Sequence, residues 1–483
     1  MTAARQLALV GGHFVAGRDD RWTEVVDPAD VREVIGLVPE MTTSDVLSAL
    51  DAAVAGRDAW AKRSPIERGQ ILYRATQVIR SWHDDMTTLI VRECGKMRHE
   101  ASVEVTKAAD FFEYYAGFGR LSTGTLLPDA RPRVRAWAEQ EPVGVVVAIT
   151  PFNDPLLTPA RKVAPALIAG NSVILKPASQ TPLIALRLAE ALHEAGIPAG
   201  VMNVVTGRVD PAINALLDDE RVAAITFTGS TENGRRLSHR VAGRNTRLQV
   251  ELGGKNTAVV LADADLDRAA RTIVAAAFAQ AGQRCTATSR VLVEHTIHDA
   301  LVEAVLASTG EIQLGPGSET SSTMGPLIDQ RQVAWILGSV QATTNAGARV
   351  IHGGREAAGT LEPGCFVEPT LIVDVPLEAP AWTDELFGPV VAIRPVTSLD
   401  AAITEINRSR YGLATSLFTS NLDAADAFIR QVDTGQVAIN LPTAGWDVHL
   451  PFGGFRDSGS AWKEQGVEAI DFYTRVKTVA IAP

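Results

Sequence analysis

The middle of the chain alternates short apolar runs with helical segments, and this pattern limits the fold more than any other feature. The run 143–149 is rich in β-branched residues, as expected of a strand buried on both faces. A helical segment follows at 156–169, then a short strand at 172–175, a helix that Thr181 and Pro182 open, and strands at 201–205 and 223–227. Strands that alternate with helices of about 12 residues predict a parallel sheet with right-handed crossovers.

The second half of the chain repeats this pattern. Strands are expected at 257–261, 290–294, 366–373, 390–395 and 415–419, and helices at 266–281 and 298–306. Residues 45–118 have the spacing and capping residues of helices. The fold class is therefore α/β, with two α/β domains that meet near 251–256.

Two further segments have the pattern of exposed strands. In 131–142 the apolar Val134, Ala136 and Ala138 alternate with bulky or charged neighbours, and a second such strand is expected at 472–481. Exposed strand edges must be covered to avoid uncontrolled pairing. We therefore expect these segments to pair with another subunit in a homodimer or homotetramer.

Composition excludes several classes of function. The net charge of −11 argues against nucleic acid as a partner, because phosphate binding draws on a basic surface. No stretch approaches the ~18 apolar residues of a membrane helix, and residues 1–14 are too weakly apolar for a signal peptide. Three cysteines do not form a disulfide framework. We expect a soluble cytoplasmic enzyme with no nucleic-acid or membrane partner.

Several common site motifs are incomplete. The glycines before Lys255 suggest a phosphate loop, but Gln249 and Asn256 stand where that motif requires glycine and serine or threonine. His193 and Glu194 are not followed by a second histidine at position 197, and no other histidine or cysteine spacing fits a metal site. No metal is expected.

A turn of small residues, 229–234, directly follows the strand at 223–227 and precedes a helical segment. Such a turn at a helix N-terminus suits a nucleotide phosphate. It lacks the complete dinucleotide fingerprint, so by itself it is equally consistent with an ordinary tight turn.

Two residues are candidates for covalent chemistry. Cys285 follows a predicted helix among small polar residues, next to Arg284, whose charge would lower the pKa of the thiol. Glu251 stands before two glycines at the end of an apolar run and could act as a movable general base. Taken singly, an inert core cysteine and a capping carboxylate are the commoner readings, and the former applies to Cys94 and Cys365.

Seven short motifs then change this balance, because their joint order is far more specific than any one of them. The chain resembles the aldehyde dehydrogenase superfamily over nearly its whole length through Thr150–Asn153, Lys176–Ser179, Phe227–Thr231, Glu251–Lys255, Gly282–Cys285, Glu385–Pro389 and Pro451–Gly454.

The resemblance implies a reaction and a domain layout. Cys285 would attack the aldehyde, Asn153 and the backbone N–H of Cys285 would hold the oxyanion, and Glu251 would activate the water that hydrolyses the thioester. Residues 1–122 and 143–250 would form a Rossmann-type NAD(P)-binding domain, 251–440 the catalytic domain, and 123–142 with 467–483 an oligomerisation arm.

The resemblance also assigns the cofactor site. Lys176 and Glu385 would hold the two riboses, Phe387 would lie against the nicotinamide and Ser230 would contact the pyrophosphate. Further cofactor contacts are expected from Ile149, Thr150, Pro151, Gly229, Gly234 and Leu252. Relatives that prefer NAD often carry glutamate where this chain has Ser179, so we expect tolerance of NADP or preference for it over NAD.

The substrate is less well defined. Arg161 matches an arginine that binds the distal carboxylate in succinate semialdehyde dehydrogenases, but a second arginine of those enzymes is Ala279 here. Segments around 282–290, 440–452, 464–466 and 472–474 are more similar to 2-oxoglutarate semialdehyde dehydrogenases. Arg284, Thr443 and Phe455 are further candidates for substrate contact, and Asp154 replaces a bulky apolar residue of the family.

Three alternatives stay open. Trp446, Phe455 and Trp462 would suit an aromatic aldehyde, although loop packing is the interpretation that we prefer for them. A CoA-acylating enzyme is disfavoured by Glu251, which would serve as a hydrolytic base. A structural or binding homologue that has lost catalysis is disfavoured by the presence of Asn153, Glu251 and Cys285 together.

Overall fold

The structure is a computed structural model that describes residues 4–207 and 211–482. Its first half contains a five-stranded parallel sheet in the order β11-β10-β7-β8-β9. The strands are β7 (Val145–Ile149), β8 (Ser172–Lys176), β9 (Met202–Val204), β10 (Val222–Thr228) and β11 (Arg247–Glu251). The predicted parallel sheet is confirmed.

Helices cover both faces of this sheet, which explains the continuous apolar run of β7. Val146 and Ala148 belong to the core under the helices on one face, whereas Val145 and Val147 belong to the core on the other. The first group is α2 (Pro65–Ser81), α3 (His83–Cys94), α4 (Arg98–Gly117), α5 (Leu157–Ile168) and α6 (Leu183–Glu194). The second is α1 (Thr43–Ala61), α7 (Ala212–Asp218) and α8 (Thr231–Val241).

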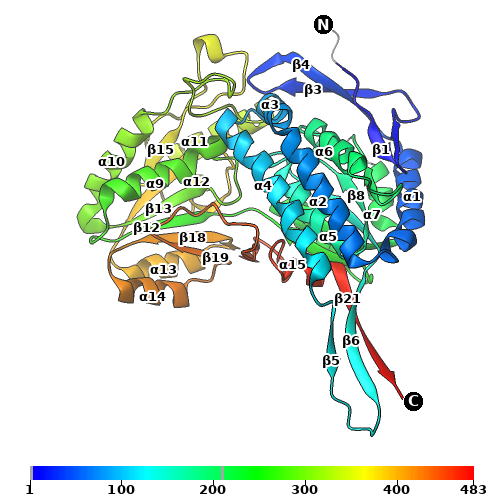
Figure 1. Ribbon diagram of the computed structural model, residues 1–483. Coiled ribbons are helices and arrows are strands. Elements are labelled where there is room, and N and C mark those ends of the chain that lie inside the picture. The colour runs from blue at the N-terminus through cyan, green and yellow to red at the C-terminus, as the bar shows by residue number, and fades with distance from the viewer. Residues whose placement is uncertain (1–3, 208–210, 483) are drawn as a thin grey trace.

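The second half forms a seven-stranded sheet in the order β14-β15-β16-β13-β12-β18-β19, which is parallel except for β14. This second sheet lies beside the first sheet (Figure 1). Its strands are β12 (Asn256–Val260), β13 (Thr288–Glu294), β14 (Arg349–His352), β15 (Thr370–Val373), β16 (Val390–Val396), β18 (Ala414–Phe418) and β19 (Gln436–Ile439). Its helices are α9 (Leu266–Phe278), α10 (His298–Gly310), α11 (Gln330–Asn345), α12 (Pro380–Thr383), α13 (Leu399–Arg408) and α14 (Leu422–Gln431).

Two expected elements of this half are shorter than predicted. The strand expected at 366–373 begins only at Thr370. The helix expected to reach 281 ends at Phe278, because Gln280 and Ala281 have left-handed backbones, each with φ of 54°. A non-glycine residue rarely adopts this conformation, and two in succession cannot continue a helix. The chain therefore turns sharply just before Cys285.

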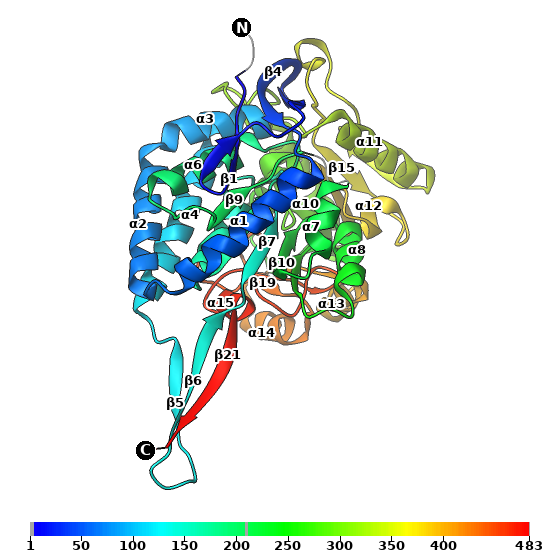
Figure 2. The ribbon, with the colours of Figure 1, turned by 90° about the vertical axis from the view of Figure 1, so that its right-hand side faces the viewer.

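A three-stranded antiparallel sheet stands out from the body of the molecule (Figures 1 and 2). It consists of β5 (Gly124–Leu127), β6 (Arg135–Pro142) and β21 (Thr474–Ile481). The predicted strand at 472–481 is wrong at its start, because Phe472 and Tyr473 end the short helix α15 (Ala469–Tyr473) and are buried in the first core. Their large rings gain more from packing there than from an exposed edge.

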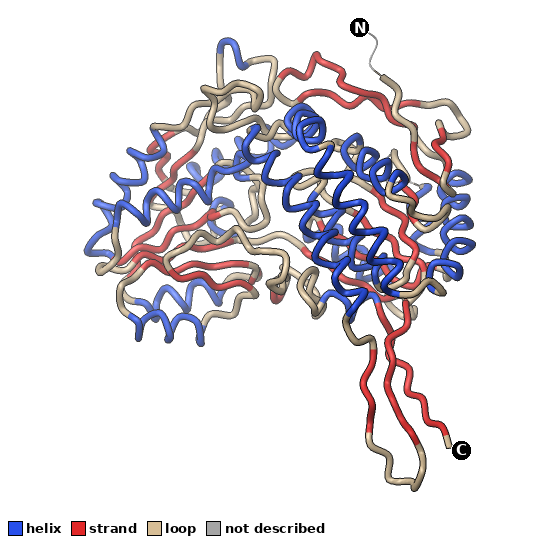
Figure 3. The backbone as a smooth tube through the Cα atoms, viewed as in Figure 1, coloured by secondary structure: helices blue, strands red, loops and turns tan. Residues whose placement is uncertain are grey.

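The remaining strands pair in antiparallel twos, and the tube view colours all strands red (Figure 3). These remaining strands are β1 (Ala8–Val10), β2 (His13–Val15), β3 (Trp22–Asp27), β4 (Asp30–Pro39), β17 (Tyr411–Gly412) and β20 (Phe455–Arg456). Within residues 4–207 and 211–482, no helix combines the length and the apolar composition that a membrane crossing requires.

Candidate active site

The carboxyl ends of four adjacent strands place the predicted site residues at one edge of the first sheet. Ile149 pairs with both Lys176 and Phe227, and Thr228 pairs with Glu251. In chain order, β8 and β9 are added to one side of β7, and β10 and β11 are then added to its other side. Ligands of open α/β sheets bind at such a reversal of strand order. The crevice therefore lies between the turns that follow β7 and β10.

The turn after β10 is shaped for a phosphate. Ser230 caps α8, because its Oγ accepts a hydrogen bond from the backbone N–H of Asn233 at 3.4 Å. Gly229 donates its N–H to the carbonyl of Glu251. Gly234 allows α8 to approach Leu252, since a Cβ there would lie 2.4 Å from Leu252 Cδ2. The N–H groups at a helix N-terminus favour an anion, which agrees with the predicted phosphate contact at the start of α8.

The residues assigned to the ribose end lie along β7 and β8. Burial lowers the pKa of Lys176 to about 8, and its Nζ donates to the Pro177 carbonyl at 2.6 Å. Thr150 is buried, with no hydrogen-bond partner for its Oγ1 among the described residues, and Ile149 and Pro151 are half-buried. Ser179 is exposed at the edge of a small hollow.

Glu385 and Phe387 face the same region from the second half of the chain. Glu385 Oε1 accepts the N–H of Gly254 at 3.0 Å, and burial raises the pKa of this carboxyl to about 7. Phe387 has a left-handed backbone with φ of 54°, and its ring lies edge-on to that of Phe152 at 5.7 Å. This backbone strain fixes the ring beside the turn that follows β7.

Cys285 stands just after the left-handed turn. Its carbonyl accepts a hydrogen bond from Asn256 Nδ2 at 2.7 Å. Burial raises the pKa of the thiol to about 12, and Arg161 is the charge that opposes this rise most strongly. Arg284, expected from its neighbouring position to lower the pKa, is not among the main charges acting on the thiol. The resting form at neutral pH is therefore the thiol.

Asn153 and Glu251 are both buried, and each has a side-chain polar atom without a hydrogen-bond partner among the described residues. Asn153 is 6% exposed, and no described residue accepts a hydrogen bond from its side-chain amide. Glu251 is 2% exposed; its Oε2 accepts the N–H of Gly454 at 3.4 Å, whereas Oε1 has no partner in the described chain. Burial and the charge of Glu464 raise the pKa of Glu251 well above that of an ordinary carboxyl.

Sequence reasoning missed the charges behind Glu251. The Lys162 ammonium is completely buried and bonds to Thr226 Oγ1 at 2.8 Å and to Glu464 Oε1 at 2.5 Å. Although burial alone would raise it, the pKa of Glu464 is held at about 2 by Lys162 and Arg161. Lys162 and Glu464 are 302 positions apart in the sequence, and no local pattern pairs them.

The predicted substrate residues have different surroundings. Arg161 donates from Nη1 to Glu464 Oε2 at 3.0 Å, while its guanidinium lies 4.9 Å from the centre of the Phe452 ring. Arg284 is half-buried, its carbonyl accepts the N–H of Ala287 at 3.0 Å, and its guanidinium makes no ion pair or hydrogen bond with the described residues. It lines a small hollow with Glu385 and Phe387.

Thr443 and the predicted aromatic residues differ in their burial and contacts. Thr443 is completely buried and bonds to the carbonyl of Thr286, so its hydroxyl supports the loop after Cys285 rather than facing a substrate. Phe455 is exposed, and Trp446 is half-buried. Trp462 packs edge-on against Phe472 in the first core, which favours the loop-packing interpretation for this residue.

The site does not coincide with a large hollow at the base of the three-stranded sheet. That hollow, about 990 Å³, lies between α2, β6 and α15, and none of the predicted site residues lines it. The crevice is instead identified by the convergence of strand ends and by the unpartnered polar atoms of Thr150, Asn153 and Glu251.

A turn of nucleotide-binding type, a half-buried thiol, an amide and an unpartnered buried carboxyl are together the parts of an α/β oxidoreductase with a cysteine in its site. The chain belongs to the aldehyde dehydrogenase family, whose family model matches residues 14–479. It is an NAD(P)-dependent aldehyde dehydrogenase, as the sequence motifs predicted.

Three similar proteins show the range of this likeness. The alpha-ketoglutaric semialdehyde dehydrogenase of Bacillus subtilis is 36% identical over 99% of this chain and 98% of its own length. The phenylacetaldehyde dehydrogenase of Pseudomonas fluorescens is 38% identical over 98% of this chain and 95% of its own. A crystal structure described as an E. coli NADP-dependent enzyme has a TM-score of 0.96 and 34% identity over 99% and 98% of the two chains.

Proposed function

We propose that this enzyme oxidises a short aldehyde that carries a carboxylate, such as 2-oxoglutarate semialdehyde or succinate semialdehyde, through a thioester on Cys285. The observation that carries the choice of substrate is the buried Nε of Arg161, which has no acceptor among the described residues. A buried guanidinium N–H without a partner is costly, and a carboxylate is the acceptor that arginine binds best. The similarity to an alpha-ketoglutaric semialdehyde dehydrogenase supports the same class.

The reaction follows from the residues of the crevice. Cys285 Sγ, once deprotonated, forms a bond to the aldehyde carbon, and the carbonyl oxygen becomes an oxyanion that Asn153 Nδ2 and the Cys285 N–H stabilise. A bound NAD(P) would supply the hydride acceptor for the aldehyde C–H, and Cys285 would then hold the acyl group as a thioester. Glu251 then takes a proton from water, whose hydroxide displaces the thiolate and releases the acid. Lys176, Ser230 and Glu385 would hold the cofactor.

For the cofactor we propose NADP, with NAD as a possible second choice. Ser179 supplies no negative charge at the exposed edge where a carboxylate would repel a 2′-phosphate, and Lys176 lies three residues before it, at the end of β8. The similarity to an NADP-dependent enzyme of known structure supports this choice.

We also propose that residues 123–142 and 467–483 form an oligomerisation arm and that the enzyme is a homodimer or homotetramer. Leu126 is 78% exposed and Val476 is 68% exposed on the three-stranded sheet. Apolar side chains on a protruding sheet are typical of an interface. Light scattering at micromolar concentration tests this, and a monomer would contradict it.

The test of the function is a comparison of kcat/KM for NADP and NAD with five aldehydes: 2-oxoglutarate semialdehyde, succinate semialdehyde, glutarate semialdehyde, benzaldehyde and acetaldehyde. We expect a carboxylate-bearing aldehyde with NADP to be the best pair. Preference for benzaldehyde would support an aromatic substrate instead, the second candidate. That candidate draws on the Phe452 and Phe111 rings around Arg161 and on the phenylacetaldehyde dehydrogenase relative.

A further inference from the structure

Asp154 is a half-buried carboxylate directly after the candidate oxyanion residue Asn153. Its Oδ1 accepts hydrogen bonds from Lys96 Nζ at 2.6 Å and from Gln280 Nε2 at 3.2 Å. Although burial would raise it, Lys96 and Arg284 bring the pKa of Asp154 down to about 2, so the carboxylate is charged at neutral pH.

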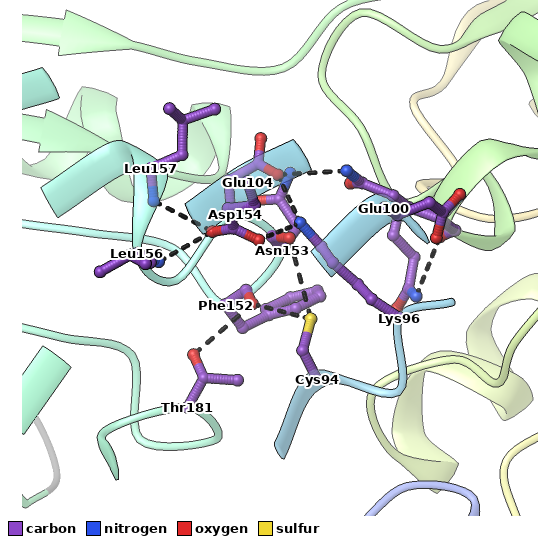
Figure 4. A network of polar contacts seen from close by, with 12 residues as sticks. Cys94, Lys96, Glu100, Glu104, Phe152, Asn153, Asp154, Leu156, Leu157 and Thr181 are labelled. Atoms are coloured by element: carbon purple, nitrogen blue, oxygen red, sulfur yellow. Dashed lines mark hydrogen bonds and ion pairs between the residues drawn. The ribbon is translucent and has the colours of Figure 1, made fainter. Parts of the chain in front are cut away.

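The turn that carries Asn153 is held from α4. Figure 4 shows the Lys96 ammonium between the carboxylates of Asp154 and Glu104. Glu104 Oε2 lies 2.6 Å from Lys96 Nζ, and its Oε1 accepts the N–H groups of Leu156 and Leu157, at 2.8 and 3.0 Å, where α5 begins. These contacts fix both ends of the segment 153–157.

The turn that carries Cys285 is held by the same group of residues. Gln280, with its left-handed backbone, donates its own N–H to Glu100 Oε1 at 2.7 Å and its side-chain amide to Asp154. Glu100 and Glu104 lie one turn apart on α4. The Gln280–Asp154 hydrogen bond thus joins the turn before Cys285 to the turn of Asn153.

We propose that Asp154 is a positioning residue: through Gln280 and Lys96 it sets the distance between the Asn153 amide and the Cys285 thiol. This inference rests on the proposed function, in which the Asn153 amide stabilises the oxyanion of the aldehyde and Cys285 Sγ bonds to its carbon. Misplacing a reacting group by about 1 Å can cost roughly 10²-fold in rate. Asp154 itself touches neither substrate nor cofactor in this role.

A double-mutant cycle tests the proposal with the best aldehyde of the panel. In Asp154→Ala the Lys96–Glu104 pair remains, so no buried ammonium is left without a counter-ion. In Gln280→Ala the backbone bond to Glu100 remains. We expect each variant to lose roughly 10- to 100-fold in kcat with KM changed by less than about threefold. The double variant should be no slower than the slower single variant, since each substitution already removes the Gln280–Asp154 hydrogen bond.

Two further readouts separate positioning from general damage. Asp154→Asn keeps an oxygen that accepts from Gln280 and should restore kcat to within about fivefold of the wild type. Alkylation of Cys285 by iodoacetamide, which needs no oxyanion stabilisation, should be no slower in Asp154→Ala than in the wild type.

Four results would overturn the proposal: wild-type kcat in Asp154→Ala or in Gln280→Ala, losses that multiply in the double variant, failure of Asn to rescue, or a fall in alkylation rate that matches the fall in kcat. If Asp154→Ala does not fold, Gln280→Ala alone tests the link: its kcat should still fall roughly 10- to 100-fold, while Asp154→Asn should stay within about fivefold of the wild type. A wild-type enzyme that reduces neither cofactor with any aldehyde contradicts the proposed function itself, which is a distinct outcome.

Discussion

The guanidinium of Arg161 donates to Glu464 through Nη1 at 3.0 Å, while its Nε, equally buried, has no acceptor among the described residues. The ion pair holds the side chain in place, and the remaining donor is available to a ligand. Arg161 is also the charge that most strongly opposes the rise in the pKa of Cys285.

Replacing Arg161 tests the carboxylate contact. Arg161→Ala should raise KM for a carboxylate-bearing aldehyde by roughly 10- to 100-fold, since a charged hydrogen bond contributes about 1.5–3 kcal/mol. KM for acetaldehyde, which has no carboxylate, is the internal control and should change by less than about threefold in the same variant. Equal changes for both aldehydes would remove the argument for a carboxylate substrate.

Glu251 should be needed for hydrolysis and not for the first hydride transfer. Glu251→Gln keeps the size of the side chain but cannot take a proton, so steady-state turnover should fall by roughly 10²- to 10⁴-fold. A rapid-mixing experiment should still record a first burst of reduced cofactor. Cys285→Ala is the control and should give no burst; the loss of the burst in Glu251→Gln would contradict the assigned role.

The pH dependence of thioester hydrolysis follows from the raised pKa of Glu251. Burial and the charge of Glu464 favour its protonated form, and only the deprotonated form is a base. The hydrolysis rate should therefore increase with pH well beyond the usual carboxyl range and then level off. Measured by single turnover, a rate already constant at mildly acidic pH would show that Glu251 is ionised or is not the base.

Ser179 should control the choice between the two cofactors. Ser179→Glu places a carboxylate where the 2′-phosphate would lie, so kcat/KM for NADP should fall at least about tenfold relative to NAD, which corresponds to about 1.4 kcal/mol. Ser179→Thr adds bulk without charge and should leave the ratio nearly unchanged. An unaltered ratio in the glutamate variant would place the 2′-phosphate elsewhere.

Gly234 should be needed for the packing of α8. An added methyl group would meet the side chain of the buried Leu252, so Gly234→Ala should lower the free energy of unfolding by about 1–3 kcal/mol. Gly338 is exposed in α11 with nothing within 4 Å of an added Cβ, and Gly338→Ala should be neutral or stabilising. Denaturant titration compares the two, and equal stabilities would contradict the tight approach.

Much of the fold follows from local pattern. The run 143–149 identifies β7 because a strand covered by helices on both faces is a nearly continuous apolar run. The left-handed Gln280 and Ala281 could not be foreseen, since both residues ordinarily favour helix. Tertiary packing also overrides the strand pattern at Phe472, which lies in a helix against Trp462.

The candidate site was predictable only where a residue stands in a recognisable motif. Cys285, Glu251 and Asn153 were identified in this way, and their surroundings were not. Lys162 and Glu464 meet through the tertiary fold alone, and a sequence pattern does not give the distance between them. The same holds for Lys96, whose partner Asp154 is 58 positions away.

The most direct test of the central claim is the site of the covalent intermediate. Glu251→Gln should be mixed with the preferred semialdehyde and oxidised cofactor, quenched in acid, digested and mapped by mass spectrometry. We predict about one acyl group per subunit, on the peptide that contains Cys285, and none in the Glu251→Gln, Cys285→Ala double variant. An acyl group on Cys94 or Cys365, or reduced cofactor formed without any adduct in the double variant, would contradict the account.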